Sequence, residues 1–333
     1  MEFMMGRYVL TRLGYAVLTI WVAFTLAFVV LRVVPGDPVS IQLSQNGADN
    51  AEVSAEQLAA LRAQLGVDKP ALAQYAEYGF GLLRGDPGYS IRSNENVGAV
   101  ISAALPATAE LAGLALTIGA PVGIALAVAA TLTRRHRSGA VFRSAPVVGI
   151  SLPTFLIGLV LVHFVAFEWR LLPGIGGRGP GSVVLPALTL AVPVAAIIGQ
   201  ILGRNMEATY RQPFVRTLRA KGLGEGKIVF GHVLRNACLP ALTMIAMVIG
   251  GLISGSVVVE TIFSRHGMGK VVADAILDKD TPVVLAITVL SAALIVSINL
   301  TVDILYRVVD PRLRTSGTSA TPRSEERAEY AHL

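Results

Sequence analysis

The chain has 333 residues, of which 53% are hydrophobic and only 15% are charged, and its mean hydropathy is +0.62. A soluble domain carries about 25% charged residues, so these values exclude an ordinary soluble enzyme and a disordered chain. A single cysteine excludes a disulfide scaffold and a Cys-based zinc or iron–sulfur site. The formal net charge of +6 would suit nucleic-acid binding, and the distribution of the basic residues decides that question.

Several uncharged stretches are long enough to cross a bilayer as helices, which takes about 20 apolar residues. They cover residues 13–31, 111–133, 144–167, 179–203, 236–259 and 281–302. None alternates as the strands of a membrane barrel do, so the sequence predicts an all-α polytopic membrane protein with six transmembrane helices. The first stretch is too long for the apolar region of a signal peptide and lacks a small-residue cleavage site, so we expect it to remain as a span. Residues 1–4 fit either a native start or a cloning remnant.

The basic residues are distributed unevenly between the two sides that these spans define. Most of the 28 Lys and Arg lie on one side, namely Arg7, Arg12, Arg134, Arg135, Arg137, Arg143, Arg204, Arg211, Arg216, Arg219, Lys221, Lys227, Arg235, Arg307, Arg312, Arg314, Arg323 and Arg327. The positive-inside rule places that side, with both termini, in the cytoplasm. Because the basic excess sets the topology and no aromatic residues are interleaved with it, we do not expect nucleic-acid binding.

The polar segments divide the chain into four regions. These are an N-terminal segment with the first span (1–33), an extracytoplasmic segment with short helices (34–105), a five-helix core with a cytoplasmic loop at 207–235 (106–306), and a cytoplasmic tail (307–333). The tail is rich in Ser, Thr, Glu and Arg, a composition typical of disorder.

Short helices are predicted in the outer segments. One would cover 54–66, with Ser54 as its N-cap and Gly66 as its stop, and others would cover 71–83 and 270–277. The first outer segment is too large for a plain connector. We therefore expect it to dock against the outer mouth of the protein or against a partner.

The chain lacks the common motifs for nucleotide binding and catalysis. GxxxxGK[ST] does not occur. Ser151 lies in a 149–153 stretch that lacks the final glycine of a nucleophile elbow, and we interpret it as a span-lining serine in a proline-broken helix. The five histidines are scattered and HExxH is absent. We predict no catalytic residue and no metal site, so another chain would have to supply energy for uphill transport.

Two acids and a group of small residues are candidates for lining a path. Glu110 begins the second span and Asp303 ends the sixth, and ionisable groups at membrane depth are costly enough to suggest a function. We favour a structural role for both, with pathway lining as the alternative and proton coupling as the least favoured. Gly251 and Gly255 have the GxxxG spacing that lets helices approach closely or line a pore. The candidate path or gate residues are Glu110, Ser151, Gly251, Ser254 and Gly255.

The cytoplasmic segment 210–223 has the pattern of a short amphipathic helix. Phe214, Val215 and Leu218 share one helical face, whereas the basic residues project elsewhere. Gly222 then allows a sharp turn. Such a helix suits a groove on a soluble partner or a layer of anionic headgroups, and its periodicity does not decide between them.

Around these residues the sequence resembles the permease subunits of ATP-binding-cassette importers, specifically the first-permease branch of the dipeptide, oligopeptide and nickel group. The resemblance rests on 216–222 (RTLRAKG) and 234–240 (LRNACLP), which are similar to that branch's version of the EAA loop. The strict Glu-Ala-Ala triplet is replaced by Arg-Thr-Leu, and the gap from Gly222 to Leu239-Pro240 is longer. Further matching motifs are 34–38 (VPGDP), 88–92 (GYSIR), 105–111 (LPATAEL), 256–263 (SVVVETIF), 267–269 (GMG), 303–306 (DILY) and 310–312 (DPR).

This resemblance implies a type I importer permease fold in the bacterial cytoplasmic membrane and active import of short peptides. The chain would form half of the translocation path, beside a second related permease, two P-loop ATPases or one bifunctional ATPase, and an extracytoplasmic solute-binding protein. The coupling loop that docks on the ATPase would consist of Arg216, Thr217, Leu218, Arg219, Ala220, Lys221 and Gly222. ATP and Mg would lie on the ATPases, so no cofactor is expected on this chain. The alternatives are import of nickel or glutathione and, less favoured, an ATP-independent channel or secondary transporter.

Overall fold

The computed structural model describes residues 2–33, 39, 59, 62, 68–134, 136–176, 179–241 and 244–309. Its helical elements are α1 (Glu2–Val33), α4 (Ala71–Leu83), α5 (Val97–Leu132), α6 (Ser138–Ser151), α7 (Thr154–Leu161), η2 (Val162–Glu168), η3 (Pro180–Val183), α8 (Val184–Tyr210), α9 (Pro213–Ala220), α10 (Glu225–Ile228), η4 (Val229–Val233), α11 (Leu234–Ala241), α12 (Met244–Ile262), α13 (Met268–Leu277) and α14 (Thr281–Val309). Within these ranges the only extended pairing is an isolated bridge between Tyr89 and Asn96. The all-helical prediction is confirmed.

Four helices are long and apolar enough to cross a membrane: Leu10–Val33 of α1, α5, Gly181–Tyr210 and Thr281–Val302 of α14. A fifth span is available if α6 and the following α7–η2 segment count together. The apolar part of α12, Met247–Ile262, is shorter. The described residues therefore give four or five full-length spans, whereas six spans were expected. The differences lie in the third and the fifth expected spans.

The third expected span is broken at a proline. α6 ends at Ser151, α7 begins at Thr154, and the two segments are bent by 100°. Pro153 disfavours the helical conformation of the residue before it, and Leu152 accordingly adopts the extended backbone angles φ −82° and ψ 124°. The span expected over 144–167 thus consists of two segments at a sharp angle, with the break at the proline that the sequence indicated.

The fifth expected span, 236–259, is divided between α11 and α12, with residues 242 and 243 outside the described ranges. Among the short outer helices, the one predicted over 71–83 is confirmed as α4, and the one over 270–277 lies within α13. The VPGDP motif and the end of the tail from residue 310 lie outside the described residues, as does the helix predicted over 54–66 except for residues 59 and 62.

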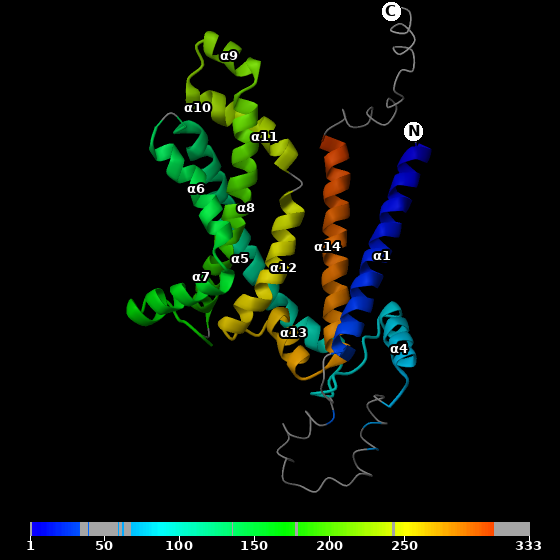
Figure 1. The fold of residues 1–333 in the computed structure, drawn as a ribbon. Helices are drawn as coiled ribbons and strands as arrows, with labels where there is room; N and C mark the ends of the chain where they lie inside the picture. Colours follow the sequence, from blue (N-terminus) through cyan, green and yellow to red (C-terminus); the bar gives the residue numbers. More distant parts are fainter. Residues whose placement is uncertain are drawn as a thin grey trace, which may run out of the picture.

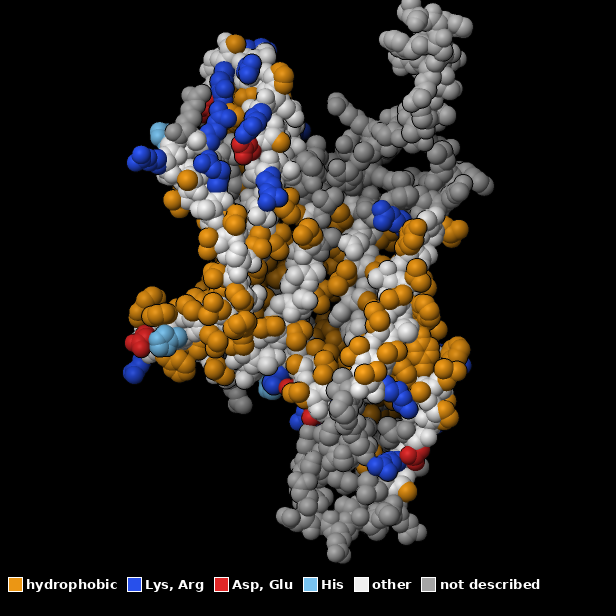
Figure 2. All heavy atoms as spheres, viewed as in Figure 1, with side chains coloured by type: hydrophobic (Ala, Val, Ile, Leu, Met, Phe, Trp, Pro, Cys, Tyr) orange, Lys and Arg blue, Asp and Glu red, His pale blue; other side chains and the backbone are white. Residues whose placement is uncertain are grey.

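The helices give the molecule two distinct ends (Figure 1). The start of α1 and the end of α14 lie at the end that carries α9 and α10, and α4 and α13 lie at the opposite end. Lys and Arg side chains gather at the α9 end, and hydrophobic side chains cover the middle of the molecule (Figure 2). This distribution agrees with the sidedness derived from the basic residues.

The centre of the fold is the pair α5 and α8, whose backbones approach closely at two glycines. A Cβ added at Gly119 would lie 2.7 Å from the Ala191 carbonyl oxygen, and one at Gly123 would lie 2.7 Å from that of Ala195. Small residues one helical turn apart permit this approach. By contrast, a Cβ at Gly251 would meet nothing within 4 Å. The GxxxG contact that organises the core is therefore the one in α5.

The first and last spans pack together beside this centre. Phe24 and Phe28 of α1 form a buried cluster with Leu285 of α14. Tyr75 of α4 packs on the same group, with its ring centroid 5.0 Å from that of Phe24, and its hydroxyl is 2.8 Å from Oγ1 of Thr25. α4 is thereby fixed to the outer end of α1.

Candidate functional site

The predicted coupling segment forms α9, and its ends follow from local sequence. Pro213 occupies the first helical turn, where its missing N–H costs nothing. The helix ends at Ala220, and Gly222 then adopts φ +80°, a left-handed conformation that strains residues with a Cβ. The predicted amphipathic helix and the glycine turn are both confirmed.

The apolar face of α9 packs against its own chain. Val215 is 1% exposed and belongs to a buried cluster with Ile228 and Val233, against which Phe214 and Leu218 also pack. This apolar face therefore fixes the helix to α10 and η4 and is not available to a partner.

The opposite face of α9 is exposed and polar. Arg216, Thr217, Ala220, Lys221 and Gly222 all lie on the surface, at the end of the molecule where basic side chains gather (Figure 2). A partner that docks here meets two cations and small side chains.

Arg219 differs from its neighbours in the predicted coupling set because its side chain turns back toward the protein. Its Nε donates to Oε1 of Glu225 at 2.7 Å, and its guanidinium also donates to the hydroxyl of Tyr210. The Tyr210 hydroxyl in turn donates to Glu225. The Tyr210 ring also contacts Arg134, whose Cζ lies 3.6 Å from the ring centroid. This cluster joins the ends of α5 and α8 to α9 and α10, and it positions α9.

The hydrogen bond from Arg219, followed by that from Tyr210, lowers the pKa of Glu225 below its ordinary value. Glu225 is therefore ionised at neutral pH. Its side chain is 53% exposed and that of Arg219 is 33% exposed. Exposed ion pairs contribute about 0–1 kcal/mol, so the pair orients α9 more than it stabilises the fold.

A buried carboxylate organises the opposite end of the molecule. Glu260, at the end of α12, is fully buried. It accepts hydrogen bonds from Oγ1 of Thr108 at 2.6 Å and from the backbone N–H groups of Gly269 and Lys270 at 2.7 and 3.1 Å. These N–H groups belong to the first turn of α13, which has no partners for them within the helix. Glu260 thus ties α5, α12 and α13 together.

Glycines make this arrangement possible. A Cβ at Gly267 would overlap the Glu260 carboxylate, and a Cβ at Gly269 would lie 2.6 Å from Cα of Val257. The two glycines of the GMG motif therefore allow the end of α12 and the start of α13 to come into close contact.

Glu110 has a partner in the same region. It forms an ion pair with Arg265, which is only 15% exposed and also reaches the carbonyl of Ala107. Glu110 itself is 54% exposed. This contact favours the structural interpretation of Glu110 over a place in the path.

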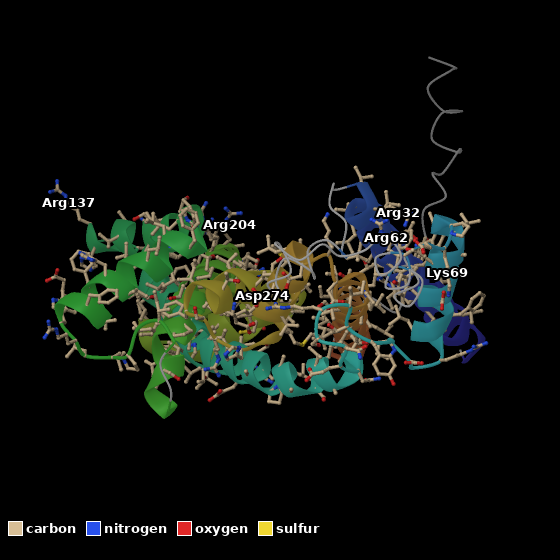
Figure 3. All side chains as sticks on the ribbon, turned by 90° about the horizontal axis from the view of Figure 1, so that it is seen from below. Arg32, Arg62, Lys69, Arg137, Arg204 and Asp274 are labelled. Atoms are coloured by element: carbon tan, nitrogen blue, oxygen red, sulfur yellow. The ribbon has the colours of Figure 1, made fainter. Side chains whose placement is uncertain are left out.

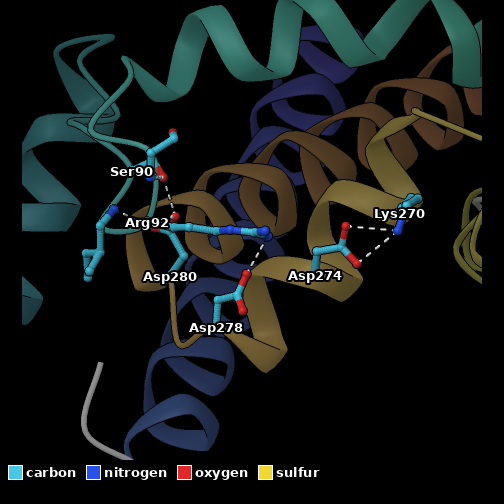
Figure 4. A network of polar contacts seen from close by, with 8 residues as sticks. Ser90, Arg92, Lys270, Asp274, Asp278 and Asp280 are labelled. Carbon is cyan, nitrogen blue, oxygen red and sulfur yellow. Dashed lines mark hydrogen bonds and ion pairs between the residues drawn. The ribbon is translucent and has the colours of Figure 1, made fainter. Parts of the chain in front are cut away.

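The GYSIR motif docks onto the turn between α13 and α14 (Figure 4). Asp280 is 2% exposed and accepts hydrogen bonds from the Ser90 hydroxyl and from the N–H of Ile91 at 3.1 Å. Arg92 forms an ion pair with Asp278 at 2.6 Å. Burial, together with Glu77 and Asp280, raises the pKa of the neighbouring Tyr78 to about 12.

The other path candidates remain predictions. Oγ of Ser151 donates to the carbonyl of Val147 at 2.9 Å, which closes the last turn of α6. Gly251 and Ser254 are exposed on one side of α12, and a Cβ at Gly255 would contact Leu190. In the described ranges no hydrogen bond joins any two of the five candidates.

Comparison with known proteins agrees with this architecture. The chain belongs to the family described as binding-protein-dependent transport system inner membrane component, which it matches over residues 119–315, and its residues 5–112 match the corresponding N-terminal family. It is therefore a multi-pass permease component of an ABC transporter in the inner membrane.

Curated relatives cover nearly the whole chain. The dipeptide transport system permease protein DppB of Lactococcus lactis is 33% identical over 93% of this chain and 100% of its own length. DppB of Escherichia coli K12 is 33% identical, over 93% of this chain and 99% of its own. DppB of Bacillus subtilis is 32% identical, with coverages of 93% and 98%.

Proposed function

We propose that this chain is the permease subunit of an importer for short peptides and forms half of the translocation path. The observation that carries this proposal is the near full-length similarity to three permeases named for dipeptide transport. Because the alignments include both the outer segment and the core, they support a common architecture and not only a shared docking loop.

In this proposal six spans cross the membrane, with α6–α7 as the third and α11–α12 as the fifth, in a type I importer fold with both termini in the cytoplasm. The regions 1–33, 34–105, 106–306 and 307–333 keep the roles expected from the sequence. The exposed face of α9 docks into a groove of a P-loop ATPase. Arg219 does not contact the ATPase but holds α9 in position through its hydrogen bond to Glu225. The family description, a binding-protein-dependent system, implies ATPase and binding-protein partners.

The complete assembly would contain a second related permease, two ATPases or one bifunctional ATPase, and an extracytoplasmic solute-binding protein. ATP and Mg would bind to the ATPases, and this chain would carry no cofactor. Gentle affinity purification of the chain from its native membrane, followed by mass spectrometry, tests this composition. Recovery of the chain alone or only with itself would contradict ATP coupling and favour a channel or secondary transporter.

Substrate class is tested by uptake into cells that lack this chain. We expect loss of ATP-dependent uptake of radiolabelled dipeptide and tripeptide and its return when the chain is restored. Nickel-63 and labelled glutathione are measured in the same cells. Unchanged peptide uptake with loss of nickel or glutathione uptake would overturn the peptide assignment and leave the importer class intact.

A further inference from the structure

A cavity of about 220 Å³ lies between the ends of α5, α6 and α8 on the basic side of the molecule. Its polar lining includes Arg134, Arg143 and Arg204, and its apolar lining includes Phe142 and Val147. Ligand pockets for whole small molecules start at about 300 Å³. The space therefore suits one compact charged group better than a peptide.

The lining of this cavity carries a net positive charge, because it contains three arginines and one acid. No ion pair in the described part of the chain involves Arg134, Arg143 or Arg204, and Arg134 is instead stacked on the ring of Tyr210. The one acid in the lining is Glu207, which pairs with Arg211 at 2.5 Å. Three arginines therefore line a common space, and none of them is in an ion pair within the described ranges.

The depth of the cavity along α8 matches the edge of the hydrocarbon layer. From Val184 to Arg204 the helix rises about 30 Å, which is the thickness of the hydrocarbon core. Arg204 is the first charged residue after this apolar length. It is thus placed where lipid headgroups begin, given the membrane orientation proposed above.

The neighbouring surface of α6 is apolar. Val147, which lines the cavity, is 49% exposed, and Val141 and Val148 of the same helix are 64% and 56% exposed. An acyl chain can run along these side chains while a polar group enters the cavity. Guanidinium groups bind phosphate oxygens with paired, charge-assisted hydrogen bonds, and basic pockets between spans on the cytoplasmic side suit anionic lipids.

We propose that this cavity binds the phosphate of an anionic phospholipid, such as phosphatidylglycerol, from the cytoplasmic leaflet. The arginines hold the phosphate and the exposed valines of α6 contact the acyl chain. Because Arg134 also stacks on Tyr210, the bound lipid would be adjacent to the cluster that positions α9. The inference does not depend on which solute the transporter carries.

The test uses the full transporter complex, purified in a zwitterionic detergent and titrated with lipids by native mass spectrometry. Phosphatidylglycerol is compared with phosphatidylcholine, and inorganic phosphate is the competitor that represents a free anion. The test variant is Arg143→Gln/Arg204→Gln. The matched control is Arg12→Gln/Arg137→Gln, which removes the same charge from the same side outside the cavity lining. Arg137 projects away from the helices, apart from Arg204 (Figure 3).

We expect phosphatidylglycerol to bind in preference to phosphatidylcholine, and the test variant to lose about thirtyfold in affinity. The control variant should keep the affinity of the parent complex. Equal binding of the two lipids, or equal losses in the two variants, would overturn the site. Saturable binding of inorganic phosphate that displaces the lipid and shows the same arginine dependence would overturn the lipid source. Intact peptide uptake in a variant that has lost lipid binding would leave the transport function standing on its own.

Discussion

Substitution of Gly267 by alanine is expected to detach the first turn of α13 from α12. The added methyl group would overlap the Glu260 carboxylate, which cannot move without losing its hydrogen bonds from Thr108 and from the N–H groups of Gly269 and Lys270. Hydrogen bonds to a charged group contribute about 1.5 kcal/mol or more each. Loss of the two backbone bonds therefore lowers the free energy of local opening by about 3 kcal/mol, which corresponds to roughly 100-fold faster amide exchange.

Hydrogen–deuterium exchange of the purified complex in nanodiscs measures this opening at peptides that cover 265–272. Glu260→Ala removes the same acceptor and should accelerate exchange by a similar factor. In the double variant the methyl group has no carboxylate to displace, so its effect should equal that of Glu260→Ala alone. Gly113→Ala is the control, because its Cβ would meet nothing within 4 Å. Additive effects of the two substitutions, or unchanged exchange in Gly267→Ala, would refute the contact as described.

Three further outcomes are expected from other parts of the fold. Gly222→Glu should reduce uptake more than tenfold while membrane insertion stays intact, because the residue has φ +80° and lies on the exposed face; normal uptake would remove the coupling assignment. Because the pKa of Glu225 is lowered in the folded protein, its contact with Arg219 stabilises the fold fully above the ordinary glutamate pKa of about 4.3. This stabilisation is lost as the pH falls through the lowered pKa. The melting temperature, measured between pH 6 and 3, should show this loss in the parent protein and not in Glu225→Gln. Truncation after Leu313 should leave complex assembly unchanged, and failure of assembly would assign the tail a structural role.

The sequence was sufficient for features that depend on local pattern. Apolar length gave most of the spans, the i, i+3 and i+4 spacing gave α9, and Gly222 marked the turn after it. The sequence did not predict which surface covers the apolar face of α9. An amphipathic pattern shows that one side is buried, and it does not show whether the covering surface is another chain or, as here, α10 and η4.

The acids show a second limit of the sequence. Glu110 attracted interest because it begins an apolar run, and Glu260 ends one in the same way. The structure makes Glu260 the buried member and pairs Glu110 with Arg265. Position along a span cannot distinguish these roles, because burial of a carboxylate depends on donors that arrive from distant segments such as Thr108. Pro153 marks the position of the break in the sequence. The 100° angle between α6 and the α7–η2 segment depends on how the two pack against the rest of the fold.

The contact between α1 and α14 has a consequence for biogenesis. Phe24 and Phe28 contact Tyr75 of α4, but their buried cluster is complete only when Leu285 is present. At about 5–20 residues per second, synthesis of the intervening chain takes more than roughly ten seconds. During that interval α1 must stay in the bilayer without α14. Lipid or an insertion factor then covers the face of α1 that α14 later buries. Nascent chains that end before α14 should therefore be the form most readily recognised by membrane quality-control proteases.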